Sequence, residues 1–273
     1  MKRVGHYVGV IFIMFWGLAP FYWMLVTALR DKRHTFDTTP WPTHVTLANF
    51  NDALATDKGN NFLGAIGNSL VISLTTTLLA VLVGVFTAYA LARLDFPGKG
   101  IITGIILAAS MFPGIALVTP LFQLFGDLGW IGTYRAMIIP NISFALPLTV
   151  YTLVSFLQQL PWELEEAARV DGATRGQAFR LVLLPLATPA IFTTAIIAFI
   201  TTWNEFMLAR QLSTTATEPV TVAIARFSGP SAFEYPYAAI MAAGSLVTVP
   251  LIIMVLVFQR RIVSGLTAGG VKG

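Results

Sequence analysis

Long apolar stretches alternate along this chain with short segments that hold nearly all of its charge. A helix needs about 20 apolar residues to cross roughly 30 Å of hydrocarbon, and several stretches reach that length. The pattern therefore predicts an all-α integral membrane protein with six transmembrane helices. We place them at approximately Val8–Leu29, Ser69–Ala92, Ile101–Phe122, Ala136–Leu157, Pro189–Ala209 and Tyr237–Phe258.

The third and fourth of these helices contain prolines, namely Pro113, Pro120, Pro140 and Pro147. Proline frees a backbone carbonyl, which inside a membrane must be satisfied by neighbouring protein or by water. We therefore expect both helices to be interrupted and to face protein or a pathway rather than lipid. Such kinks serve motion in some proteins and only packing in others, and the sequence favours neither.

The composition agrees with a membrane protein and excludes some other classes. The chain has 273 residues, of which 56% are hydrophobic and 11% charged, whereas soluble domains carry about 25% charged residues. It has no cysteine, which excludes disulfides and thiol chemistry. The pI near 9.5 fits membrane orientation better than nucleic-acid binding, because the excess positive charges are scattered. Residues Tyr7–Leu29 exceed the ~7–15-residue core of a signal peptide, so we expect a retained first span.

Basic residues set the expected orientation, because cytoplasmic loops carry an excess of Lys and Arg. If the N-terminus lies inside, the cytoplasmic set is Lys2, Arg3, Arg93, Lys99, Arg169, Arg175, Arg180, Arg260, Arg261 and Lys272. The outer set is then the smaller one: Arg30, Lys32, Arg33, Lys58, Arg135, Arg210 and Arg226. This bias, together with the even number of spans, predicts a multi-pass membrane protein with both termini in the cytoplasm.

Two segments would then lie outside. The first, Arg30–Gly67, has no sustained apolar face, so it is either a docking surface or, as its composition favours, a solvated connection. The second, Gln211–Pro236, combines a Thr-rich sequence with the aromatic residues Phe227, Phe233 and Tyr235, and Tyr237 follows it. Such aromatics suit either an interface or the aromatic belt at a membrane surface. No repeat or linker divides the chain, which predicts a single domain over residues 1–273.

One polar segment, at about residues 161–187, interrupts the apolar pattern with a distinctive order of residues. Pro161 suits the first turn of a helix, and Glu163, Glu165 and Glu166 suit its positive N-terminal end. Asp171-Gly172 predicts a turn, since Gly accepts positive φ after a helix. We expect a second helix from near Thr174 to Leu184, with Pro185 and Pro189 at the return to the membrane. The alternative is an ordinary amphipathic loop.

The spacing in this segment resembles the signature loop of the permeases of bacterial binding-protein-dependent ABC importers. Glu166-Ala167-Ala168, then Gly172, then Val182-Leu183-Leu184-Pro185 match the pattern E-A-A-x-x-x-G-x(9)-I-x-L-P, with Val182 in the place of Ile. The resemblance implies that this loop enters a cleft on a separate ATPase. The residues that it assigns to ATPase coupling are Glu166, Ala167, Ala168, Asp171, Gly172 and Pro185.

The chain has no phosphate-binding loop of its own, because Phe96-Pro97-Gly98-Lys99-Gly100 lacks the first glycine and the hydroxyl residue of that motif. We therefore expect no enzyme activity and no cofactor in this chain, with ATP and Mg²⁺ on the partner ATPase. The implied partners are an ABC ATPase dimer, a second and non-identical permease subunit, an extracytoplasmic sugar-binding protein and the lipid bilayer.

The resemblance covers almost the whole chain. In particular, the chain is similar to the smaller permease of maltose- and trehalose-type sugar importers. It rests on segments such as Asn68-Ser69-Leu70, Tyr89–Lys99, Met111-Phe112-Pro113, Trp203-Asn204-Glu205 and Gly265–Gly273. The last of these segments implies that a cytoplasmic tail, residues 259–273, reaches into the ATPase dimer. Its candidate contacts are Thr267, Gly270 and Lys272. A di- or oligosaccharide is the implied substrate; the particular sugar stays open.

Polar and aromatic residues inside the spans are candidates to line the pathway, because burying polar groups in lipid is costly. These candidates are Asn141, Tyr151, Trp203, Asn204 and Glu205, and Met111 and Phe112 are candidates for a hydrophobic gate in the same pathway. Asn, Glu, Trp and Tyr suit a sugar, which binds through hydrogen bonds and ring stacking. The same groups could instead only bond neighbouring helices, and in maltose-type systems the partner permease is implied to hold most sugar contacts.

Three other functions fit less well. A proton-coupled secondary sugar carrier needs ionisable residues in its spans, and only Glu205 qualifies. A membrane metalloenzyme needs a motif such as H-E-x-x-H, whereas His6, His34 and His44 are not so arranged, so no metal site is predicted. A passive channel would leave the signature loop without a role. The secondary carrier remains the alternative.

Overall fold

The computed structural model describes residues 2–56, 61–227 and 235–270, with side chains over 5–56, 61–227 and 235–258. All the named elements in these ranges are helices, and the β contact recorded there is one isolated antiparallel bridge between Arg30 and Val45. The all-α class predicted from the sequence is confirmed. The chain divides into two compact units, which are Met1–Gly67 with Val220–Ile252 and Asn68–Pro219 with Ile253–Gly273. A single domain over residues 1–273 stays a prediction.

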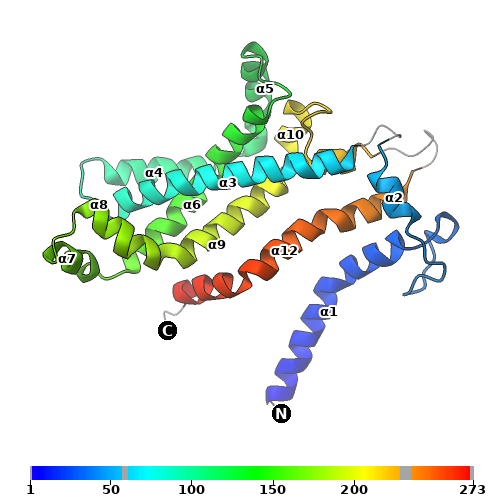
Figure 1. The fold of residues 1–273 in the computed structure, drawn as a ribbon, viewed down its shortest axis with the longest axis horizontal. Helices are drawn as coiled ribbons and strands as arrows, with labels where there is room; N and C mark the ends of the chain where they lie inside the picture. Colours follow the sequence, from blue (N-terminus) through cyan, green and yellow to red (C-terminus); the bar gives the residue numbers. More distant parts are fainter. Residues whose placement is uncertain (1, 57–60, 228–234, 271–273) are drawn as a thin grey trace. The chain divides into compact units, whose positions relative to one another are not determined.

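Five helices in the described ranges are long and apolar enough to cross a membrane (Figure 1). They are α1 (Lys2–Ala28), α3 (Phe62–Arg93), α6 (Tyr134–Gln159), α9 (Leu184–Trp203, which continues from α8) and α12 (Tyr237–Gly270). A bent pair of shorter helices raises the number to six if it counts as one span. The first, second, fourth and sixth predicted spans coincide with α1, α3, α6 and α12, so their positions are confirmed.

The third predicted span, Ile101–Phe122, is not one straight helix. It is formed by α4 (Lys99–Ser110), a 3-10 turn η2 (Gly114–Leu117) and α5 (Val118–Asp127), with a bend of 88° between the two parts. Pro113 lies in the break with extended dihedral angles, φ −69° and ψ 114°. The interruption expected at Pro113 is therefore confirmed. Pro120 lies in the first turn of α5, where a missing N–H costs little.

The fourth predicted span was expected to be interrupted at Pro140 and Pro147, and this expectation was wrong. Helix α6 runs without a break from Tyr134 to Gln159, and both prolines are buried within it. Neighbouring protein packs around this part of α6, chiefly from α9. Buried proline is tolerated in a spanning helix when neighbouring protein satisfies the backbone, so the expected protein environment is present although the break is absent.

The fifth predicted span, Pro189–Ala209, has the wrong limits. Helix α9 begins at Leu184 and ends at Trp203, and the short helix α10 (Met207–Leu212) follows. Asn204 leaves helical geometry with ψ near 2°. Apolar content alone could not show this corner, because Phe206, Met207 and Leu208 continue the hydrophobic run.

The first unit contains α1, the segment after it, α2 (Ala48–Leu54), α11 (Val220–Ala225) and the beginning of α12. Arg30 is fully buried there and donates to the backbone carbonyls of Asp37 and Thr39. Asn49 donates to the Arg30 carbonyl at 2.6 Å, while the His34 ring lowers the pKa of Asp31 below its ordinary value by hydrogen bonding to the carboxylate. The segment after α1 is therefore more ordered than the solvated connection that its composition favoured.

The second unit packs α3, α6 and α9 side by side (Figure 1). Small side chains let these helices approach closely, as is common between membrane helices. The buried cluster consists of Ala88, Ala92, Leu153, Leu157, Ala187 and Ala190, and Tyr89 packs against it. This bundle carries a helical corner at one end and the short helix α10 toward the other end (Figure 1).

Candidate functional site

The helical corner at one end of the second unit contains the signature segment. Helix α7 (Glu163–Val170) has Glu163, Glu165 and Glu166 in its first turn, where the helix dipole favours negative charge. Pro161 lies just before the helix instead of in its first turn, a difference within the usual uncertainty of helix ends. The first predicted helix of the segment is confirmed.

The turn after α7 has the geometry that its glycine predicted. Gly172 has φ +91°, in the left-handed region where a side chain is strained. Ala173 N–H donates to the Ala168 carbonyl at 3.0 Å, and Gly172 N–H donates to the Arg169 carbonyl at 3.1 Å. This pair of bonds is a Schellman motif, which satisfies the last free carbonyls of the helix.

The second helix of the corner begins as predicted but does not end at Leu184. Thr174 and Gln177 form a reciprocal capping box at the start of α8 (Arg175–Ala178). A π-helical turn, Phe179–Leu183, then joins α8 directly to α9. The predicted return at Pro185 is therefore not a break. Because Pro185 has no N–H to donate to the preceding turn, the wider π turn stands where an α-helical bond would be missing.

The exposed face of this corner includes most of the predicted coupling residues. Glu166, Ala167, Asp171, Gly172 and Pro185 are exposed and Ala168 is partly exposed. Two apolar side chains are also exposed: Val170 on α7 is 87% exposed, and Leu181 in the π turn is 67% exposed. Apolar side chains left this open on a rigid, capped corner suit a surface that another protein covers.

Buried polar contacts fasten the opposite face of α7 to the C-terminal end of α3. Tyr89 Oη donates to Glu165 Oε1 at 3.1 Å, and Glu165 is only 7% exposed. Glu165 Oε2 is buried without a hydrogen-bond partner among the described residues. The Tyr89 ring also contacts the Phe179 ring, with centroids 4.5 Å apart. The sequence drew attention to Glu166, whereas the structure adds Glu165 as the internal anchor.

Arg93, the last residue of α3, fixes the segment between α6 and α7. Its Nη2 donates to the carbonyls of Leu157 and Leu160, both at 2.8 Å. Its guanidinium lies 4.5 Å from the centre of the Trp162 ring, a cation–π distance. The side chain is 5% exposed, so this is a structural cap on the end of α6 rather than a surface charge. Its sequence position, read as a cytoplasmic basic residue, gave no sign of it.

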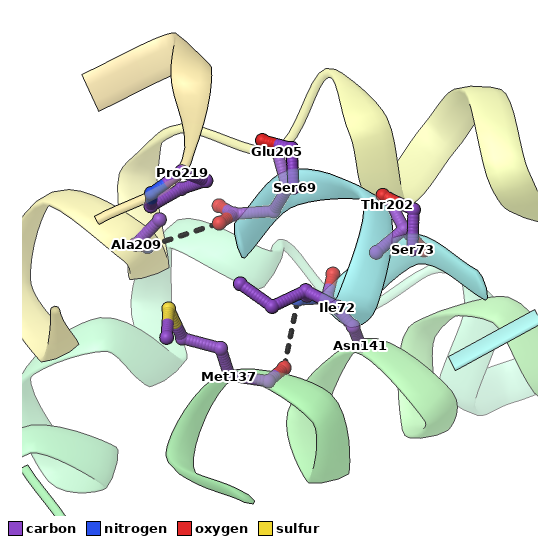
Figure 2. Close-up of a pocket in the computed structure, with 9 residues that line it drawn as sticks. All are labelled: Ser69, Ile72, Ser73, Met137, Asn141, Thr202, Glu205, Ala209 and Pro219. Carbon is purple, nitrogen blue, oxygen red and sulfur yellow. Dashed lines mark hydrogen bonds between the residues drawn. The ribbon is translucent and has the colours of Figure 1, made fainter. Parts of the chain in front are cut away.

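Toward the other end of the second unit, a small cavity lined by both polar and apolar side chains lies where α3, α6, α9 and α10 meet (Figure 2). Its lining residues are Ser69, Ile72, Ser73, Met137, Asn141, Thr202, Glu205, Ala209 and Pro219. The cavity volume of about 10 Å³ suits one water molecule. Ser73 is 1% exposed, and its hydroxyl has no partner among the described residues.

Two of the predicted pathway residues, Asn141 and Glu205, meet at this cavity, and both already bond the backbone. Asn141 Nδ2 donates to the Met137 carbonyl at 2.8 Å. The two Glu205 carboxylate oxygens accept from the N–H groups of Leu208 and Ala209 at 2.8 and 2.9 Å. Glu205 thus holds the start of α10, as the dashed contact in Figure 2 shows for Ala209.

The other predicted pathway residues do not join them. Trp203 is 1% exposed and stacks on Phe199 at 5.5 Å, while Asn204 is exposed at the end of α9. Tyr151 is 54% exposed on α6. Met111 and Phe112, which are 84% and 55% exposed, lie at the bend after α4. The structure therefore distributes these residues over several surfaces.

A second cavity, between α6 and α9, has a volume of about 40 Å³ and includes Phe144, Thr149, Thr194 and Thr201 in its lining. Sites for small molecules typically enclose about 300–1,000 Å³, so neither cavity holds a disaccharide. Within the described part of the chain, no group of three His, Cys, Asp or Glu residues could hold a metal ion. Of the predicted tail contacts, Thr267 and Gly270 lie in α12, where only the backbone is described, and Lys272 lies outside the described residues, as does Phe233.

Comparisons with known proteins agree on the kind of protein that this chain resembles. Residues 80–267 match the family model "Binding-protein-dependent transport system inner membrane component". The chain is 45% identical over 259 residues to the trehalose transport system permease protein SugB of Mycobacterium tuberculosis, covering 94% of this chain and 93% of that protein. It is 40% identical over 275 residues to the trehalose/maltose transport system permease protein MalG of Thermococcus litoralis, covering 100% and 98%.

A solved structure has the same fold. It is the crystal structure of a bacterial ABC transporter involved in the import of the acidic polysaccharide alginate, with a TM-score of 0.76 at 21% identity. The match covers 95% of this chain and 96% of that chain. At this identity the likeness concerns the helical arrangement alone.

Proposed function

Because this chain belongs to the family of inner membrane components of binding-protein-dependent transport systems, we propose that it imports a di- or oligosaccharide, trehalose or a maltose-like glucoside. In this proposal the chain forms half of the translocation pathway, and a second, non-identical permease forms the other half. Two relatives similar over nearly the whole chain are named as trehalose and trehalose/maltose permeases, and this is the observation that supports the sugar class.

The chain is an ABC sugar transporter permease, a membrane translocation subunit and not an enzyme, since its relatives are permeases of transport systems. The ATPase is a separate subunit in this family, and ATP with Mg²⁺ would bind there. A proton-coupled secondary carrier, the alternative that the sequence left open, is not favoured because the family couples transport to ATP. We place both termini in the cytoplasm, as the basic residues suggest.

The α7–α8 corner is the surface that would receive the ATPase. The exposed residues Glu166 and Ala167 stand on a capped helix, so little conformational entropy remains to be lost on docking. Ala167 and Gly172 allow close approach of a partner backbone, while Glu166 offers a carboxylate for a basic group. This preformed, uncovered corner is the single feature of the chain that best supports coupling to an ATPase.

The sugar would pass between this chain and its partner permease. This interpretation is supported by the small volumes of the two cavities described above, about 10 and 40 Å³, neither of which has room for a disaccharide. We infer that an extracytoplasmic sugar-binding protein would deliver the substrate, which agrees with the binding-protein dependence named in the family description.

The first experiment is purification of the tagged chain after expression with its genomic neighbours, followed by mass spectrometry of the proteins that co-purify. We expect a second permease and an ABC ATPase in stable proportion to the chain. A chain that purifies alone, and that takes up sugar after ATP depletion but not after collapse of the proton gradient, would replace this proposal with the secondary carrier.

Two variants then test the ATPase surface in the purified complex. Glu166→Lys should abolish sugar-stimulated ATP hydrolysis without loss of membrane insertion. Glu163→Lys is the matched control, because Glu163 is exposed on the same helix one turn earlier. Deletion of Gly265–Gly273 should lower the stimulation as well, if the tail contacts the ATPase. Equal stimulation of ATP hydrolysis in Glu166→Lys and wild type would contradict the proposal that the corner binds the ATPase.

A further inference from the structure

Helix α3 differs from the other helices that are candidate spans because it contains no proline. Helices α1, α6, α9 and α12 each contain at least one internal proline, at Pro20, at Pro140 and Pro147, at Pro189 and at Pro250. The 32 residues of α3 contain none. Since proline is a main cause of kinks in helices, α3 lacks that cause. Its one glycine between Asn68 and Tyr89, Gly84, is packed closely against Thr149.

The C-terminal end of α3 is fastened to the α7–α8 corner. Tyr89 bonds Glu165 and contacts the Phe179 ring, while Arg93 bonds the end of α6 and covers Trp162. Both Glu165 and Arg93 are more than nine-tenths buried. Any movement of α7 under load from a partner therefore reaches α3 directly, with no flexible segment between them.

The other end of the same helix is fastened to the loop after α10. Asn68 Nδ2 donates to the carbonyls of Ala216 and Glu218, at 3.1 and 3.0 Å, and Asn68 Oδ1 accepts from Tyr134 Oη at 2.7 Å. Ser69, the next residue, and Ser73, about one turn further on, line the cavity that contains Glu205 (Figure 2). From Asn68 to Tyr89 an α-helix spans about 32 Å, at 1.5 Å per residue.

We propose that α3 is a stiff connecting rod that transmits movement of the α7–α8 corner to the loop at residues 213–219 and the Glu205 cavity. Tyr89, Glu165 and Asn68 are its positioning residues, because their hydrogen bonds attach its two ends to the corner and to the loop. The proposal rests on the proposed function, in which the ATPase loads the corner. The new part is the path, along α3, by which a movement imposed by the ATPase would cross this chain.

A break in the middle of α3 tests the rod while both ends stay intact. Leu78 and Leu82 are 68% and 51% exposed, and both lie within α3 between its two fastened ends, Asn68 and Tyr89. Leu78→Gly with Leu82→Gly softens the backbone, since glycine is a much poorer helix former than alanine. Leu78→Ala with Leu82→Ala is the matched control, which removes the same side chains and keeps the helix stiff.

Two readouts follow in the assembled wild-type and variant transporters. The first is ATP hydrolysis stimulated by the sugar-loaded binding protein. The second is the ATP-dependent change in thiol labelling of Thr215→Cys, an exposed position on the 213–219 loop. Detection in this chain is clean because it has no cysteine of its own.

We expect the double-glycine protein to lose about fivefold in stimulation relative to the double-alanine protein, equivalent to about 1 kcal/mol of coupling, and to lose the ATP-dependent labelling change. Basal hydrolysis and co-purification should stay as in the control. Equal stimulation of ATP hydrolysis and equal labelling changes in the glycine and alanine proteins would contradict the proposal that α3 transmits the movement. If the double-glycine protein does not assemble, Leu82→Gly against Leu82→Ala decides by the same criteria.

Failure of the proposed function would look different. In that case the wild-type chain itself would show no ATPase partner or no sugar-stimulated hydrolysis, whatever residues stand at 78 and 82. If the wild-type complex is stimulated normally and the glycine and alanine variants are stimulated equally, the proposed function remains supported. That result contradicts only the proposal that α3 transmits the movement.

Discussion

Tyr89 and Glu165, 76 residues apart in the chain, meet in a partly buried hydrogen bond of 3.1 Å. The bond joins the longest proline-free helix of the second unit to the first turn of α7. It also separates two neighbouring glutamates by role. Glu165 faces inward and anchors the corner, whereas Glu166 faces outward and is free to contact a partner.

Removal of the Tyr89 hydroxyl should loosen this corner. Tyr89→Phe keeps the ring contact with Phe179 but leaves the Glu165 carboxylate buried without its donor, a loss of about 2 kcal/mol. Glu165→Gln should cost less, because its amide oxygen still accepts from Tyr89. Thr87→Val, at a partly exposed position on the same helix, is the control. Thermal unfolding in detergent together with stimulated ATP hydrolysis measures the effect, and equal values for Tyr89→Phe and Thr87→Val would contradict it.

Gly172 should tolerate no side chain. Its φ of +91° makes alanine strained by about 1–2 kcal/mol, so Gly172→Ala should distort the turn and reduce sugar-stimulated ATP hydrolysis while the spans still insert. Gly176→Ala is the matched control, since Gly176 lies in α8 and an added Cβ there meets nothing within 4 Å. The comparison fails if the two alanine variants are equally active.

Arg93 should matter for stability rather than for charge. Arg93→Met removes two hydrogen bonds from a guanidinium to backbone carbonyls, and such bonds contribute about 1.5–3 kcal/mol each. We expect a clear fall in the unfolding temperature and early hydrogen exchange at the end of α6. Arg169→Met, at an exposed position on α7, should change neither. A fall of the same size in both variants would mean that positive charge alone is responsible.

Glu205 should hold the corner between α9 and α10 instead of the sugar. Glu205→Ala removes both acceptors from the N–H groups of Leu208 and Ala209, at a cost of about 1–2 kcal/mol by analogy with helix caps. Glu205→Gln keeps one acceptor and should lie between alanine and wild type in stability. The KM for sugar uptake should change little in Glu205→Gln. A large rise in KM with unchanged stability would instead place Glu205 in contact with the substrate.

Local signals in the sequence predicted local structure well. The lengths of the apolar runs gave the positions of α1, α3, α6 and α12, because membrane thickness fixes helix length. Gly172 and Thr174 gave the turn and the second cap of the corner, since each acts through backbone geometry within a few residues. Pro113 gave the break after α4.

Contacts between distant segments could not be predicted in the same way. Whether a proline breaks a helix depends on what surrounds it, so Pro113 and Pro140 behave differently in otherwise similar apolar contexts. Helix α9 ends at Trp203, where Glu205 accepts hydrogen bonds from the start of α10. Hydropathy cannot predict this contact. Tyr89 with Glu165, and Asn68 with Ala216, are pairs that only the packing of the helices brings together.

The most direct measurement is uptake of radiolabelled trehalose into proteoliposomes that contain the assembled complex and the sugar-binding protein. We expect uptake that requires ATP on the ATPase side, continues when the proton gradient is collapsed, and stops in Glu166→Lys but not in Glu163→Lys. Uptake without ATP that stops when the proton gradient is collapsed would contradict an ATP-driven importer permease.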